Sequence, residues 1–83
     1  MNDTEMAEKH KMIGRNVTMY RKRKGLSQLE LSLSLGHKSV SIVASAERYY
    51  KGKHFNIEHL LKISDILNVP ISAFFEAETI SEE

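Results

Sequence analysis

Eighty-three residues with a mass of 9.5 kDa have room for one small domain. Hydrophobic residues make up 41% and charged residues 28%, which is typical of a globular chain, and the absence of cysteine excludes disulfides and thiolate metal sites. No apolar run exceeds three residues and the N-terminus carries mixed charge, so the sequence predicts neither a membrane span nor a signal peptide. We therefore expect a cytoplasmic protein with no membrane partner.

Charge is distributed unevenly along the chain. All 12 lysines and arginines lie between Lys9 and Lys62, and the only acids in that stretch are Glu30, Glu47 and Glu58. A basic centre between acidic ends indicates a surface for a polyanion. The alternative at this point is that the cations only decorate solvated helix faces.

Hydrophobic periodicity and capping signals predict helices throughout, and we expect an all-α fold of five short helices. The first helix is expected over about residues 7–24, where Gly25 ends it. A second helix begins after Ser27, which forms a capping box with Glu30 and is followed by the inward-facing Leu31 and Leu35.

A third helix is expected to begin after the Gly36-His37-Lys38 turn, with Ser39 as its N-cap. Its inward residues would be Val43, Ala46 and Tyr50. The fourth helix would be capped by Asn56 and closed by Asn68, with an inward face made of Ile57, Leu60, Ile63, Ser64 and Leu67. Pro70 would be the first residue of a fifth helix through Phe75. The expected organisation is a flexible segment over residues 1–6, a domain over 7–76 and an acidic tail over 77–83.

The sequence offers little for catalysis. His10, His37, His54 and His59 are scattered, and the spacing of His54 and His59 does not predict that both rings face one point. No nucleophile elbow, phosphate-binding glycine loop or clustered acid pair is present. We expect no enzyme, no metal site and no cofactor, with the histidines on the surface or in loops.

The span from Leu26 to Glu47 is typical of a helix-turn-helix, in which two helices are joined by a turn of three or four residues. Ser32 and Ala46 are small residues where these helices would cross. An ordinary helical hairpin would give a similar pattern, but the basic surroundings favour DNA.

Four stretches resemble the Cro/lambda-repressor-like (XRE-type) helix-turn-helix family: I-G-x-x-V-x-x-Y-R from Ile13, K-G-L-S-Q-x-E-L-S-x-x-L-G from Lys24, Ala46-Glu47-Arg48, and L-L-K-I-S-D-I-L-N-V-P-I-S-A-F-F from Leu60. The resemblance implies a compact five-helix DNA-binding domain that acts as a homodimer on half-sites about 34–36 Å apart. The intervals from Gly36 to Glu47 and from Glu47 to Ile57 are one and about two residues longer than is common in this family.

The resemblance also implies roles for individual residues. Gln28 would bond a DNA phosphate, and Arg21 would form a structural ion pair with Glu47. The third helix offers no Asn, Gln or Lys for bidentate base contacts, so phosphate contacts and DNA shape are expected to carry much of the affinity. The residues expected to meet DNA are Gln28, Lys38, Ser39, Val40, Ser41, Ser45, Arg48, Lys53 and Asn56.

Apolar residues near the C-terminus exceed what a small core can hold. We expect Ile71, Phe74, Phe75 and Ile80 to contribute to a two-fold dimer interface. Leu29 and Leu33 lie off the inward face of the second helix; they are either isolated surface leucines or a patch covered by Met6 and Met12 or by another protein.

Two functions remain open from the sequence. The first is a sequence-specific DNA-binding transcriptional regulator, a repressor, that inserts its third helix into the major groove of double-stranded DNA as a homodimer. The second is an antitoxin-like or protein-interaction module on the same fold, with a protein partner and weak or no specific DNA readout.

Overall fold

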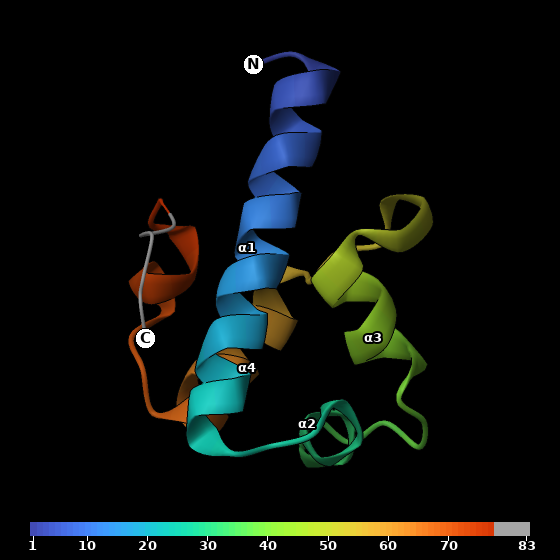
Figure 1. The fold of residues 1–83 in the computed structure, drawn as a ribbon, viewed down its shortest axis with the longest axis vertical. Helices are drawn as coiled ribbons and strands as arrows, with labels where there is room; N and C mark the ends of the chain where they lie inside the picture. The colour runs from blue at the N-terminus through green and yellow to red at the C-terminus, as the bar shows by residue number, and fades with distance from the viewer. Residues whose placement is uncertain (78–83) are drawn as a thin grey trace.

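The computed structural model describes residues 1–77 as a bundle arranged around one long helix (Figure 1). This part of the chain contains no strand, so the all-α prediction is confirmed. Its elements are α1 (Asp3–Lys24), α2 (Gln28–Ser34), α3 (Ser41–Arg48), the 3-10 segment η1 (Tyr50–Gly52), α4 (Ile57–Leu67) and the 3-10 segment η2 (Ile71–Phe75). Within residues 1–77 there are therefore four α-helices, and the predicted fifth helix is a 3-10 segment of five residues.

Helix α1 is the axis of the bundle. It contacts α3, α4 and η2, while α2 lies across the end of the bundle where α1 ends (Figure 1). The fully buried side chains come from α1, α2, α3, α4 and η2: Val17, Leu31, Ser32, Val43, Leu60, Ile63 and Phe74. This shared core fixes α2 and α3 against the long helix.

Local capping signals set most of the helix ends. Ser27 and Asn56 each form a capping box, with Glu30 and His59 respectively, as the predicted caps required. Gly25 ends α1 with φ of 82°, a left-handed conformation that glycine adopts without strain. Asn68 ends α4 in the same region.

Helix α1 begins four residues earlier than predicted. The Asn2 side chain accepts a hydrogen bond from the Glu5 N–H, and the Glu5 carboxylate accepts one from the Asn2 N–H, so a capping box starts the helix at Asp3. Hydrophobic periodicity did not predict this start, because the first turns of α1 carry mostly polar side chains and have few apolar neighbours.

Three expectations about helices α3 and α4 are wrong. Ser39 does not cap α3, whose N-cap is Val40 with no side-chain hydrogen bond. Tyr50 and Ile57 face solvent, with 44% and 62% of their surface exposed, instead of the core. The exposure of Tyr50 and of Ile57 has one cause. Helix α3 ends at Arg48, and Tyr49 and Lys51 adopt left-handed backbone conformations that redirect the chain before Phe55 enters the core.

The backbones of α1 and α3 lie very close to each other where the two helices cross. A Cβ placed on Gly14 would lie 2.6 Å from the carbonyl oxygen of Glu47 and 2.8 Å from that of Ala46. No other residue type could occupy this crossing without moving one of the helices. Two small residues predicted at helix crossings, Ser32 and Ala46, are also buried.

The end of the described chain is tied to α1 by a buried amide. The Asn16 side chain donates hydrogen bonds of 2.9 Å to the carbonyl oxygens of both Phe74 and Glu76. The Phe74 ring is completely buried and meets the Tyr20 ring edge-on, 6.0 Å between centroids. Phe74 therefore belongs to the protomer's core, and its predicted place in a dimer interface is wrong.

Candidate nucleic-acid interface

A buried ion pair positions α3. Arg21 Nε lies 2.7 Å from Glu47 Oε2 and Arg21 Nη2 lies 3.1 Å from Glu47 Oε1, with both residues 6% exposed. This is the two-pronged pair that the sequence comparison implied, well inside the separation of about 4 Å that defines an ion pair. Arg21 also donates to the Leu26 carbonyl oxygen at 2.8 Å, so the same guanidinium joins α1, α3 and the start of α2.

Gln28 does not have the free side chain expected of a phosphate ligand. Its Nε2 donates to Glu47 Oε1 at 2.8 Å, so it completes the hydrogen bonding of the buried carboxylate. Three donors thus converge on Glu47, two from Arg21 and one from Gln28. The residue therefore supports α3 from α2; its Nε2 has a second N–H, and its contact with a DNA phosphate stays a prediction.

The connection between α2 and α3 spans residues 35–40 and is longer than the three- or four-residue turn that the sequence predicted. It carries Lys38, Ser39 and Val40, all of them exposed. Ser39 Oγ lies 2.9 Å from Ser41 Oγ, so two hydroxyl groups are hydrogen-bonded to each other where α3 begins.

The polar positions of α3 that point away from the core form one stripe. Ser41 and Arg48 are exposed and Ser45 is half-buried, and all three follow the spacing opposite to the buried Val43, Ala46 and Glu47. Ile42 adds an apolar side chain that is 39% exposed on this face, and the sequence reasoning missed it. An exposed isoleucine at this place suits contact with a thymine methyl group as well as Val40 does.

All the formally charged side chains exposed between Lys38 and Asn56 are cations. Lys38, Arg48, Lys51 and Lys53 are exposed, whereas the single acid of this stretch, Glu47, is buried and paired. Arg48 and Lys51 lie 5.2 and 5.4 Å from the centroid of the Tyr50 ring, which gathers both cations after the end of α3. Asn56 is exposed, but its Oδ1 is engaged in capping α4.

The histidines are grouped, contrary to the sequence-based expectation. The His10 and His54 rings stack with centroids 3.8 Å apart, and the His37 and His59 rings meet edge-on at 5.6 Å. Burial, and then the neighbouring His54, lowers the pKa of His10; burial, and then His37, lowers the pKa of His59. Residue spacing could not reveal these contacts, because each joins two elements: the loop after α3 brings His54 to His10 on α1, and the connection between α2 and α3 brings His37 to His59 on α4.

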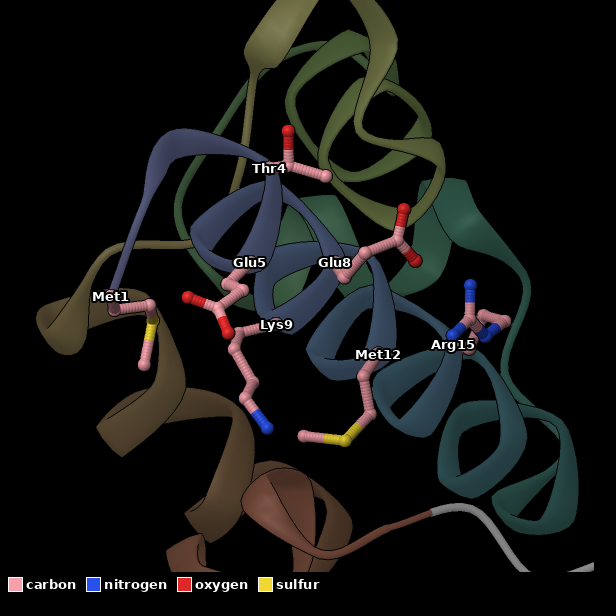
Figure 2. Close-up of a pocket in the computed structure, with 7 residues that line it drawn as sticks. All are labelled: Met1, Thr4, Glu5, Glu8, Lys9, Met12 and Arg15. Carbon is pink, nitrogen blue, oxygen red and sulfur yellow. The ribbon is translucent and has the colours of Figure 1, made fainter.

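A second surface lies along the first half of α1. Met1, Met6 and Phe75 are exposed, and a hollow of about 450 Å³ between α1 and the end of η2 is lined by these residues together with Met12 and Ile13. Figure 2 shows the Lys9 and Met12 side chains extending to the same side of α1, beside Met1. Ile71 is half-buried against the core, and Ile80 lies outside the described residues.

Leu29 and Leu33 are not covered by the N-terminal segment. They remain 47% and 54% exposed on α2, whereas Met6 lines the hollow beside Phe75 and the N-terminus lies at the opposite end of the molecule from α2 (Figure 1). Of the alternatives left open by the sequence, cover by Met6 and Met12 is therefore excluded.

Residues 1–77 contain no group of three or more potential metal ligands of the His, Cys, Asp or Glu type. In the same range, no helix combines the length and apolar character that crossing a membrane requires.

Comparisons with known proteins agree with this geometry. A family model described as helix-turn-helix matches residues 17–74, the part that holds α2, α3 and most of the core. A similar protein is the HTH-type transcriptional regulator SlrR of Bacillus subtilis (strain 168), which is 40% identical over 74 residues. That alignment covers 87% of this chain and 46% of SlrR, so the chain spans about half the length of the curated relative it matches. No solved structure is significantly similar to the chain.

Proposed function

We propose that this chain, which belongs to the XRE-type helix-turn-helix family of DNA-binding transcription regulators, is a repressor whose α3 enters the major groove of DNA. The observation that carries the proposal is the surface from Lys38 to Asn56, where four cations are exposed and the only carboxylate is buried against Arg21. Such a surface attracts a polyanion without a competing local charge. The transcriptional role named for SlrR supports the same function here.

In this proposal few side chains of the protein recognise DNA bases directly. Ser41 and Ser45 offer hydroxyls, and Ile42 and Val40 offer apolar contact to thymine methyl groups. Lys38, Arg48 and Lys53 would neutralise phosphates on either side of the groove. DNA shape and phosphate contacts therefore supply most of the affinity in the cytoplasm, where we propose that the protein acts.

Salt dependence tests the proposal. If each protomer neutralises four phosphates, affinity for duplex DNA should fall about a hundredfold for each bound protomer between about 50 and 200 mM salt. Fluorescence anisotropy with a labelled duplex measures this slope. Lys53→Ala should lower the slope by about one unit, whereas the control Lys62→Ala, on α4 and paired with Glu58 at 3.3 Å, should leave it unchanged.

A failed salt response would refute this function. Absence of binding at about 50 mM salt, or equal effects of the Lys53 and Lys62 variants, would show that the cationic surface does not face DNA.

We also propose a homodimer through the surface made by Phe75, Met1 and Met6, with Ile71 and Ile80 as the other predicted contributors. Its support is an exposed phenylalanine next to exposed methionines, a composition enriched at protein interfaces. Sedimentation should give a dimer mass at tens of micromolar. Phe75→Glu should give a monomer with weaker DNA binding, whereas the control Leu61→Glu, at an exposed leucine on α4, should remain dimeric.

The second candidate function is a protein-interaction module, and Leu29 and Leu33 favour it because they form an uncovered apolar pair one turn apart on α2. This function becomes the better account if duplex DNA does not bind at low salt. In that case Leu33→Glu should abolish binding to the protein partner without changing the unfolding free energy.

A further inference from the structure

The first half of α1 carries an apolar surface that the described part of the chain leaves uncovered. A hollow of about 450 Å³, here called the α1 hollow, has an apolar wall made of Met1, Met6, Met12, Ile13 and Phe75. Met6 and Phe75 are 46% and 45% exposed, although methionine and phenylalanine are most often buried. The α1 hollow therefore has room for a further segment of chain.

The chain reaches this hollow at a fixed point. Asn16 Nδ2 donates hydrogen bonds of 2.9 Å to the carbonyl oxygens of Phe74 and Glu76, which hold the end of η2 on α1. Ala77, the last described residue, forms part of the wall of the α1 hollow. Residues 78–83, which lie outside the described residues, therefore start at the hollow itself.

Residues 78–83 have the composition that the hollow suits. Their sequence is Glu-Thr-Ile-Ser-Glu-Glu, in which Ile80 is the single apolar residue. Ile80 comes three residues after Ala77, and an extended chain spans about 10 Å over that length. The turns of α1 from Met6 to Ile13 cover about the same distance, because a helix rises about 1.5 Å per residue. Ile80 is therefore within reach of the apolar wall.

Charge favours the same segment. Lys9 lines the α1 hollow and also an adjoining hollow of about 570 Å³, and Figure 2 shows that its side chain and that of Glu8 extend in different directions. The acids of the adjoining hollow already have partners, since Glu5 completes the capping box of α1 and Glu8 lies 3.5 Å from Lys11 Nζ. The three acids that flank Ile80 are thus matched by a cation in the wall.

A smaller hollow also has Ala77 in its wall but suits the segment less well. Its volume is about 90 Å³, and Asn16, Arg23 and Glu76 line it beside Met19. Entry of an isoleucine there would place an apolar side chain against charged and amide groups. The larger, apolar hollow is the better site for Ile80.

We infer that residues 78–83 turn back along α1 and cover the α1 hollow, with Ile80 against Met6, Met12 and Phe75. An acid of the segment lies beside Lys9. This contact goes beyond the proposed DNA-binding function and uses no residue of the surface from Lys38 to Asn56. It places Ile80 next to Phe75, so the docked segment becomes part of the surface that we propose for the homodimer.

Paramagnetic relaxation tests the contact in the full chain. The protein has no cysteine, so Ser81→Cys provides a single attachment point for a nitroxide label. The methionine methyl resonances report on the label: Met6 and Met12 line the α1 hollow, whereas Met19 lies about 10 Å farther along α1 than Met12. We expect the Met6 and Met12 signals to lose most of their intensity and the Met19 signal to lose much less.

Variants separate the apolar contact from the charge, each measured in the labelled chain at a concentration at which sedimentation shows a monomer. Ile80→Ser should lower the ratio of docked to undocked chains about tenfold or more, because the apolar side chain is lost. The control Thr79→Ser should leave this ratio unchanged. Lys9→Glu should lower it about two- to fivefold, whereas the control Lys11→Glu, at a cation outside the walls of both hollows, should have little effect.

Three results would overturn the inference. Equal losses at Met6, Met12 and Met19 would show that residues 78–83 do not dock, and the largest loss at Met19 would show that they follow the smaller hollow. In a mixture of spin-labelled chains and separate chains that carry the observed methyl groups, relaxation would show that a second copy fills the hollow. The proposed DNA-binding function has its own test in the salt dependence, so it stands or fails independently of these results.

Discussion

Replacing Glu47 by alanine removes the carboxylate on which three donors converge. Arg21 Nε, Arg21 Nη2 and Gln28 Nε2 lie 2.7, 3.1 and 2.8 Å from its oxygens. The variant leaves a guanidinium that is 6% exposed, with the Leu26 carbonyl as its remaining hydrogen-bond acceptor at 2.8 Å. A buried cation would then have lost its counter-charge.

The expected cost follows from this geometry. Breaking a buried ion pair on one side typically costs about 3–5 kcal/mol. Because the Leu26 carbonyl remains and water can enter the space left by the carboxylate, we expect a loss of about 3–4 kcal/mol in the free energy of unfolding. A chain of this size has a total stability of roughly 4–12 kcal/mol, so the variant loses a large share of it.

Urea unfolding followed by circular dichroism measures the effect. With a urea dependence of about 1–1.5 kcal/mol/M for a small domain, the midpoint should shift by about 2–4 M. Arg21→Ala should cost a similar amount, and the double variant should cost about 1.5–3 kcal/mol less than the sum. The control Glu58→Ala, in the exposed pair with Lys62, should change stability by less than about 1 kcal/mol.

Two results would refute the reasoning. Additive single-variant effects would show that Arg21 and Glu47 are not coupled. A loss for Glu47→Ala no larger than that for Glu58→Ala would show that water already solvates the pair.

Three further predictions concern stability. Gly14→Ala should cost about 1–3 kcal/mol in chemical unfolding, because its Cβ would meet backbone oxygens of α3 that cannot rotate away; a neutral effect would show that the helices can separate. Lys51→Gly should raise the unfolding free energy by about 0.5–1 kcal/mol, because Lys51 has φ of 53°; a loss would show that its contact with Tyr50 matters more. The lowered pKa values of His10 and His59 mean that the unfolded chain binds more protons, so the thermal midpoint should fall as pH falls through about 6.5 and level off below the folded pKa values; a midpoint that rises on acidification would contradict this sign.

Local signals were sufficient to predict most of the helical elements. The capping boxes at Ser27 and Asn56 and the stops at Gly25 and Asn68 depend on residues within one turn, so they can be identified without tertiary information. The Arg21–Glu47 contact was predictable from the family resemblance, and Glu47 is one of only three acids in the basic centre of the chain.

Features that depend on tertiary contacts were not predictable. The left-handed residues Tyr49 and Lys51 redirect the chain after α3, and this path exposes Tyr50 and brings His54 to His10. Neither residue is of the kind that signals a left-handed conformation. The hydrogen bond from Gln28 to Glu47 was not predicted, because the two residues lie 19 positions apart, beyond the reach of any spacing argument.

Helix α3 is held against the rest of the protein mainly at its C-terminal end. Its C-terminal half is clamped to α1 by the close approach at Gly14 and by the forked ion pair of Glu47, whereas its first residue is preceded by Val40, which provides no side-chain cap. Seven residues separate Val40 from Glu47, about 10 Å along the helix, so a tilt of 5° at the clamp moves the free end by about 0.9 Å. Such a displacement is comparable to the tolerance of a hydrogen bond to a base edge. Side chains at the C-terminal end of α3, none of which needs to touch DNA, therefore set the direction of the end that we propose to contact DNA.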